Sequence, residues 1–249
     1  MSIKVKSIVF SIIWTLVILV FPITSGVIAS IFKFNDIEIF LLQGSFMLLS
    51  LIVPFIYIIV KKYSLNEFGM RSIECGSLKK VLFLIPLLLI LLPRLVVGVS
   101  IESVQYVFAL LFFTIFVGIS EELYFRGVIL RLIKNSYESI FSVVLIPAIV
   151  FGLGHGASII GTGNAYTTVL QIINAFFFGV VAVETLMIIK SIYPLMIFHF
   201  LYNFINHISA AEGKTEVICV IVQVLITVIT SLVLFVIIRK DNSSNSEKI

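Results

Sequence analysis

Long apolar runs alternate with short polar segments along this chain. The longest runs have the roughly 17–25 residues that a helix needs to cross a bilayer, and polar residues gather where the runs end. Eight runs are predicted to be membrane-spanning helices: residues 8–31, 37–60, 81–100, 107–131, 141–157, 166–189, 192–208 and 217–238. The pattern therefore predicts an all-α fold, a bundle of about eight transmembrane helices that forms one domain over residues 1–238.

Two polar segments interrupt or follow this pattern. Residues 61–80 form the longest polar connection between predicted spans. Residues 239–249, "RKDNSSNSEKI", have few apolar side chains, and such a composition favours disorder. We therefore expect a disordered, polar cytoplasmic tail after a single domain, since the chain shows no internal repeat.

The composition agrees with a membrane protein. Hydrophobic residues make up 60% of the chain and charged residues 12%, whereas soluble domains have about 45–50% and about 25%. Mean hydropathy is +1.21. The net charge of +4 is small and scattered, so the sequence does not indicate a nucleic-acid partner. We expect the chain to be surrounded by a lipid bilayer.

The cationic side chains fall unevenly on the two sides of the predicted bundle. Lys33 and Lys214 are on one side, and Arg94 and Arg126 lie within spans. The side that holds both termini carries thirteen Lys and Arg residues: Lys4, Lys6, Lys61, Lys62, Arg71, Lys79, Lys80, Arg131, Lys134, Lys190, Arg239, Lys240 and Lys248. Because cytoplasmic segments are enriched in Lys and Arg, we predict a multi-pass protein of the cell membrane with both termini in the cytoplasm.

A first group of charged residues lies inside a predicted span, in "GISEELYFRG" at residues 118–127. A charge at this depth is costly unless it is paired or faces a wet cavity. Glu122 and Arg126 are four residues apart and share a helix face, so we expect them to pair. Glu121 points about 100° away and has no partner nearby in sequence. A purely structural charge cluster is the alternative interpretation.

Two further groups contain histidines. "FGLGHG" at residues 151–156 places His155 near the end of a span, and "HFLYN" places His199 and Asn203 on one helix face, which Asn206 and His207 continue. Each group alone is also typical of hydrogen bonding between membrane helices. At 1.5 Å per residue, Glu121, His155 and His199 lie roughly 15, 20 and 10 Å from the cytoplasmic ends of their spans. Helix tilt and a kink at Pro147 can close this difference, so we expect them to meet.

A carboxylate, two imidazoles and an amide can activate water. Peptide hydrolysis needs a base for water and hydrogen-bond donors for the oxyanion. Glu121 can be the base, His155 can orient the water, and His199 and Asn203 can be the donors. Alternatively, Glu121, His155 and His199 provide three zinc ligands with an open fourth position. We slightly favour the metal-free scheme, because buried metal ligands need supporting partners and the sequence shows none near His155.

Other patterns of intramembrane proteases are absent from the sequence. No histidine begins H-E-x-x-H, and "GASI" has Ile159 where G-x-S-G requires glycine. Asp36 and Asp241 both lie outside the predicted spans, so the chain has no intramembrane aspartate pair.

In this order, the three groups resemble the CaaX protease and bacteriocin-processing (CPBP) family of membrane proteases, also called Abi. The family pattern E-E-x-x-x-R, F-x-x-x-H and H-x-x-x-N corresponds to "EELYFR" (121–126), "FGLGH" (151–155) and "HFLYN" (199–203), within residues of about 105–207. The resemblance implies catalytic roles for Glu121, His155, His199 and Asn203, and supporting roles for Glu122 and Arg126.

The resemblance also implies a function. Members are intramembrane endopeptidases, often described as metalloproteases, although a metal-free glutamate mechanism has been argued. They trim prenylated CaaX proteins in eukaryotes, and bacterial members are linked to peptide maturation, bacteriocin self-immunity and quorum signalling. We therefore expect a peptide or membrane-protein substrate. The segment "FFFGVVAVETLMIIK" departs from many bacterial relatives, because it keeps only Gly179 among the small residues and adds Glu184.

Two other functions are compatible with the pattern: a non-catalytic immunity or partner-binding protein, and a proton-coupled transporter in which Glu121 and His155 relay protons. A transporter is less favoured, because the chain has no inverted repeat. We expect structural roles for Arg94, by snorkelling or pairing, and for Glu184, near the headgroups with Lys190.

Overall fold

A computed structural model describes residues 1–73 and 82–246, without the side chains of residues 161–162 and 241–246. Within these residues the fold is helical, apart from one isolated bridge between Val99 and Ser209. The elements are α1 (Ile3–Phe32), α2 (Asp36–Ser50), α3 (Ile52–Val60), η1 (Leu65–Phe68), η2 (Leu82–Leu84), α5 (Ile85–Val97), α6 (Val104–Glu122), η3 (Leu123–Ile129), α7 (Leu130–Lys134), α8 (Ile140–Gly154), η4 (His155–Ser158), α9 (Ile159–Thr162), α10 (Ala165–Ile189), α11 (Tyr193–Ile208) and α12 (Gly213–Ser246).

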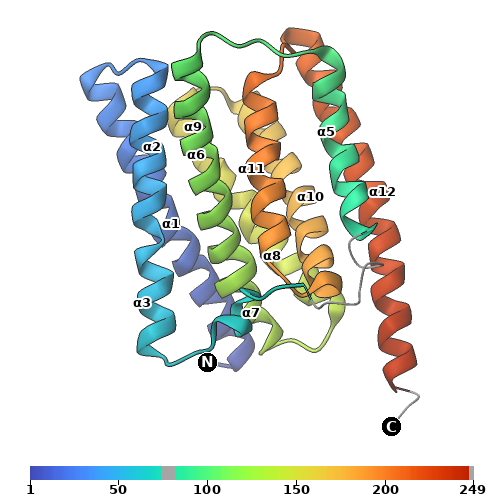
Figure 1. Ribbon diagram of the computed structural model, residues 1–249. Coiled ribbons are helices and arrows are strands. Elements are labelled where there is room, and N and C mark those ends of the chain that lie inside the picture. Colours follow the sequence, from blue (N-terminus) through green and yellow to red (C-terminus); the bar gives the residue numbers. More distant parts are fainter. Residues whose placement is uncertain (74–81, 247–249) are drawn as a thin grey trace.

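The long helices run up and down in one bundle (Figure 1). Among the residues that the structure describes, six segments are long and apolar enough to cross a membrane: Ile3–Phe32, Asp36–Val60, Val104–Lys134, Ile140–Ser158, Ala165–Ile189 and Gly213–Lys240. The segment Leu82–Val97 and helix α11 are shorter. Each of the eight predicted spans thus corresponds to a helical segment, and the all-α bundle is confirmed.

Polar residues at the ends of the apolar runs begin the helices. The Ser2 side chain accepts a hydrogen bond from the amide of Val5 at the start of α1. Asn35 and Glu38 form a reciprocal capping box at the start of α2. Such caps satisfy backbone N–H groups that have no partner within the helix.

The second predicted span contains a break between α2 and α3, which follows from Pro54. Proline has no backbone N–H, so the carbonyl of Ser50 loses its partner four residues later. The hydroxyl of Tyr124 donates to this carbonyl at 2.9 Å instead. This bond fixes the second span against η3, the element that follows the two glutamates.

The span predicted at residues 107–131 is not a regular α-helix throughout. Helix α6 ends at Glu122, and η3 (Leu123–Ile129) is a π-helical turn in which all seven residues are buried. The wider turn changes the direction of side chains along the segment, and such turns often occur at functional sites. The apolar pattern gave no sign of it.

The predicted tail at residues 239–249 is described only in part. Helix α12 continues to Ser246 and so includes residues 239–246, whereas residues 247–249 lie outside the described residues. The polar composition of residues 239–246 is compatible with a helix that leaves the apolar region without a break. Met1 and the end of α12 lie at the same end of the bundle (Figure 1), as an even number of spans requires.

Glycines allow close helix crossings around the centre of the bundle. A Cβ atom at Gly118 of α6 would lie 2.9 Å from the carbonyl oxygen of Met196 and 2.9 Å from the amide of Phe200, both in α11. A Cβ atom at Gly179 of α10 would lie 3.0 Å from Cα of Ala148 in α8. Small residues permit this approach of membrane helices, and it brings together the helices that carry the polar groups.

Candidate active site

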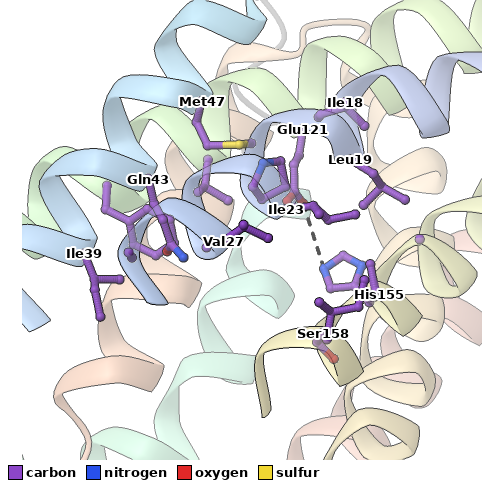
Figure 2. A pocket seen from close by; sticks show the side chains of 18 of the residues that line it. Ile18, Leu19, Ile23, Val27, Ile39, Gln43, Met47, Glu121, His155 and Ser158 are labelled. Atoms are coloured by element: carbon purple, nitrogen blue, oxygen red, sulfur yellow. Dashed lines mark ion pairs between the residues drawn. The ribbon is translucent and has the colours of Figure 1, made fainter. Parts of the chain in front are cut away.

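Glu121, in the last turn of α6, lies beside both motif histidines. Its Oε2 atom is 3.9 Å from His155 Nε2 and 3.7 Å from His199 Nε2. Figure 2 shows Glu121 and His155 facing one another across the cavity. The three residues come from α6, η4 and α11, so the predicted convergence is confirmed. Both distances exceed a direct hydrogen bond and leave Glu121 Oε2 without a protein partner in the described residues.

Glu122 points in a different direction and is fully buried. Its Oε1 atom lies 3.0 Å from Arg126 NH1, which confirms the predicted pair. The same oxygen is 2.8 Å from His199 Nδ1. This second contact joins residues 77 positions apart, and the local spacing of the motifs could not indicate it. The two adjacent glutamates therefore have different surroundings: Glu121 faces a cavity, and Glu122 holds a histidine and an arginine.

His155 begins the tight turn η4, directly after the last glycine of α8. Its Nδ1 atom lies 3.0 Å from the backbone carbonyl oxygen of Phe151, one helical turn earlier. The Phe151 ring packs edge-on against the imidazole, with centroids 4.6 Å apart. His155 thus has the supporting partner that the sequence did not show, and that reason for favouring a metal-free site was wrong. The partner is a backbone atom, which no residue pattern reveals.

The two imidazoles have matching hydrogen-bond patterns. A carbonyl oxygen and a carboxylate accept hydrogen bonds, so Nδ1 carries the hydrogen in both His155 and His199. In each ring the Nε2 atom then faces Glu121. The ring of His199 is fixed further by Phe178, whose centroid lies 4.8 Å away. Glu121, His155 and His199 therefore form a preorganised set with two oriented rings and one carboxylate.

Asn203, one turn after His199, lines the same cavity as Glu121 and His155. His207 also lines the cavity, and its Nδ1 atom donates to the backbone carbonyl of Asn203 at 2.8 Å. Asn206 instead receives a hydrogen bond from Gln223 of α12 at 3.5 Å. Asn206 thus links α11 to α12 by a hydrogen bond, which is the interhelical role that the sequence also allowed. His207 instead lines the cavity.

The cavity has a volume of about 800 Å³ and is mostly apolar. Figure 2 shows α1 and α2 side chains lining it opposite His155, with Glu121 and Gln43 among the polar groups. Its lining includes Ile18, Leu19, Ile23, Val27, Ile39, Gln43, Met47, Val117, Phe125 and Ser158. The first two spans, which carry no motif, therefore form one wall of the candidate site.

Arg126 belongs to η3 and does not line the main cavity. Its guanidinium carbon is 4.2 Å from the centre of the Phe151 ring and 5.3 Å from that of Phe178. Cation–π contacts of this kind stabilise a desolvated cation. The guanidinium thus packs on the two aromatic rings that in turn pack on His155 and His199. Arg126 therefore supports the site without facing the main cavity.

The residues match zinc in chemical type but not in spacing. Two ligands of a tetrahedral zinc with bonds of about 2.0–2.1 Å lie about 3.4 Å apart, and both nitrogens are farther from Glu121 Oε2 than this. In the part of the chain that the structure describes, no group of three His, Cys, Asp or Glu side chains could hold a metal ion. No step of the chemistry is therefore assigned to a metal.

Two other charged residues within the spans lie away from this site. Arg94 forms an ion pair with Glu216 of α12, so it is paired rather than snorkelling. Glu184 is 1% exposed and accepts a hydrogen bond from Ser231. The expectation that Glu184 lies near the headgroups with Lys190 was wrong, because its helix turns this side chain toward α12.

A comparison with protein families supports this site. The family model described as "Type II CAAX prenyl endopeptidase Rce1-like" matches residues 103–205, from the start of α6 to α11. This part of the chain belongs to the CPBP family. The match includes every motif residue of the candidate site. CPBP proteins of this type are intramembrane endopeptidases, and the membrane helices of the chain agree with such a protein. No curated protein matches the chain.

Proposed function

We propose that this CPBP protein is an intramembrane endopeptidase that hydrolyses a peptide bond with water activated by Glu121. One observation carries the proposal. The Glu121 Oε2 atom has no hydrogen-bond partner in the described protein and lies within 3.9 Å of two oriented imidazole nitrogens, at the wall of a cavity of about 800 Å³. A carboxylate in this position can accept a proton from water.

His155 would orient the attacking water. Its Nδ1–H donates to Phe151, so Nε2 of the neutral ring can accept one hydrogen of the water. Glu121 accepts the other hydrogen as the water oxygen bonds to the carbonyl carbon. This arrangement fixes both the position and the proton path of the nucleophile, which a glutamate alone would not do.

His199 and Asn203 would stabilise the oxyanion. When both nitrogens of His199 carry hydrogen, Nδ1–H donates to Glu122 and Nε2–H can donate to the substrate oxygen. The side-chain amide of Asn203 supplies a second donor from the cavity wall. The tetrahedral intermediate then collapses: the carbon–nitrogen bond breaks, and the proton held by Glu121 passes to the leaving amine.

The substrate class follows from the walls of the cavity. Apolar side chains of α1 and α2 line it beside Glu121, so a peptide that enters it would be apolar or held in the membrane. We therefore propose membrane-associated peptides or proteins as substrates. Peptide maturation and bacteriocin self-immunity are roles that such an activity would serve.

The test compares the membrane peptides of cells that carry wild-type protein, Glu121→Gln or the matched control Glu138→Gln, which changes an exposed glutamate outside the site. Candidate products are then generated with purified protein in heavy-oxygen water, where hydrolysis places the label in the new carboxyl group. We expect products from the wild type and the control, and a loss of at least about 10²-fold in Glu121→Gln. Equal products from Glu121→Gln would exclude Glu121 as the base. No products from the wild type would favour the non-catalytic or transport functions.

A further inference from the structure

A second cavity lies at the end of the bundle where Met1 and the end of α12 are found. It has a volume of about 230 Å³ and is formed by η1, the residues after it, η3, α7 and the last turn of α10. Figure 1 shows α7 close to this end of the bundle. The volume corresponds to roughly eight water molecules, which leaves room for a tetrahedral phosphate group.

The lining of this cavity is strongly basic. Five cationic side chains and one carboxylate, Glu67, surround it; the cations are Arg71, Arg126, Arg131, Lys134 and Lys190. Glu67 is already engaged, because it accepts from Arg131 at 2.6 Å. Lys134 lies within electrostatic range of Arg71 and Lys190, which repel it. Among the described residues, no carboxylate is close enough to pair with any of these three cations.

A buried arginine adds hydrogen-bond donors at the inner wall. Arg126 lines the cavity although its side chain is only 1% exposed. Within the described residues, neither of its terminal nitrogens has a hydrogen-bond partner. The nearby Glu122 lies at ion-pair distance from one of them, but a guanidinium has five N–H donors in a planar fork that suits phosphate oxygens.

The backbone holds the cavity in shape. Ile192 donates to the carbonyl of Gly69 at 2.8 Å, and Arg71 Nε donates to the carbonyl of Lys190 at 2.6 Å. Ser191 donates to the carbonyl of Arg71 at 2.5 Å. These bonds join the segment after η1 to the turn after α10, so the cations on both sides are held together before any ligand binds.

We infer that this cavity binds a phosphate-bearing anion. Arg71, Lys134 and Lys190 would contact the outer oxygens, and Arg126 would contact the inner one. Because the cavity lies where two candidate spans end, a lipid headgroup can reach it, and basic pockets at such positions bind anionic headgroups. Free phosphate has the same chemistry. This inference does not depend on proteolysis.

The experiment measures binding to the purified full-length protein. One arm follows the thermal unfolding midpoint in detergent with inorganic phosphate or chloride at equal ionic strength, since a ligand of the folded state raises that midpoint. The other arm counts lipids retained in native mass spectra when the micelles contain phosphatidylglycerol or phosphatidylcholine. The variants are Lys134→Gln and Lys190→Asn; asparagine suits Lys190 because this residue has φ 61°. The matched control, Lys61→Gln, removes an exposed charge outside the cavity.

We expect phosphate, phosphatidylglycerol or both to bind the wild type and Lys61→Gln equally. Each cavity variant should bind about tenfold more weakly, since a charge-assisted hydrogen bond is lost. Binding of phosphatidylglycerol alone identifies a lipid site, and binding of inorganic phosphate alone identifies a soluble anion. The inference is overturned if the wild type binds neither probe, or if the cavity variants bind as tightly as Lys61→Gln does.

Discussion

His199 Nδ1 lies 2.8 Å from Glu122 Oε1, and both side chains are almost completely buried. The same carboxylate oxygen lies 3.0 Å from Arg126 NH1. One glutamate therefore orients an imidazole of the candidate site and balances a buried guanidinium. Its neighbour Glu121 makes no contact this short with either group, because its nearest imidazole nitrogen is 3.7 Å away. The two adjacent glutamates should therefore respond differently to the same substitution.

Glu122→Gln should lower both stability and activity. Glutamine keeps an oxygen that can accept from His199, but Arg126 then stays buried without an opposite charge at that position. Removing one partner of a buried ion pair costs about 3–5 kcal/mol, which thermal unfolding in detergent will show as a lower midpoint. Glu121→Gln should unfold at the same temperature as the wild type and lose only activity.

A double variant separates the lost charge from a general packing defect. Glu122→Gln combined with Arg126→Met removes both charges and should recover part of the stability lost in Glu122→Gln. It should not recover activity, because His199 still lacks its carboxylate. A double variant less stable than Glu122→Gln would contradict the pairing.

Gly118→Ala should separate the helices that carry Glu121 and His199. The added Cβ would meet the backbone of Met196 and Phe200 at 2.9 Å, and backbone atoms cannot move aside as a side-chain tip can. We expect a destabilisation of about 1–3 kcal/mol, measured by thermal unfolding, together with reduced peptide hydrolysis. Gly26→Ala is the matched control, since its Cβ would have nothing within 4 Å. Equal stability of the two variants would contradict the close crossing.

The sequence was sufficient for the spans and for contacts within one helix. Apolar runs predicted the eight helical segments, because the bilayer sets the length of a spanning helix. The four-residue spacing also predicted the contact between Glu122 and Arg126, which depends only on helix geometry. The pairs that join Glu121 to His155 and His199 were expected from motif order and depth.

Other parts of the site depend on features that have no periodic signature. The π-helical turn at Leu123–Ile129 arises within a segment whose apolar pattern suits an ordinary helix. The contact between Glu122 and His199 depends on how α6 and α11 rotate against each other. The partner of His155 is a backbone carbonyl, and the wall formed by α1 and α2 contains ordinary apolar residues. Tertiary packing decides all of these.

The topology prediction can be tested with single cysteines. Cys75 lies outside the described residues, so a Cys75→Ser background is preferable. The remaining Cys219 is only 3% exposed. Lys61→Cys and Lys214→Cys place thiols at exposed positions near opposite ends of the bundle. If both termini are cytoplasmic, an impermeant thiol reagent should label Lys214→Cys in intact cells and Lys61→Cys only after permeabilisation. The reverse pattern would invert the orientation.

The last prediction concerns the metal. The spacing around Glu121 Oε2 is wider than a tetrahedral zinc site requires, so purified protein should hold much less than one zinc per chain, and chelators should leave peptide hydrolysis unchanged. His199→Ala and Asn203→Ala should each reduce hydrolysis by about 10²–10³-fold, since each removes an oxyanion donor. Asn203 is the more informative residue, because an amide is a poor zinc ligand and a good hydrogen-bond donor. Zinc content by mass spectrometry and hydrolysis before and after chelation provide the measurement. About one zinc per wild-type chain, lost in both His155→Ala and His199→Ala and retained in Asn203→Ala, would instead show that Glu121 and the two histidines close around a metal ion.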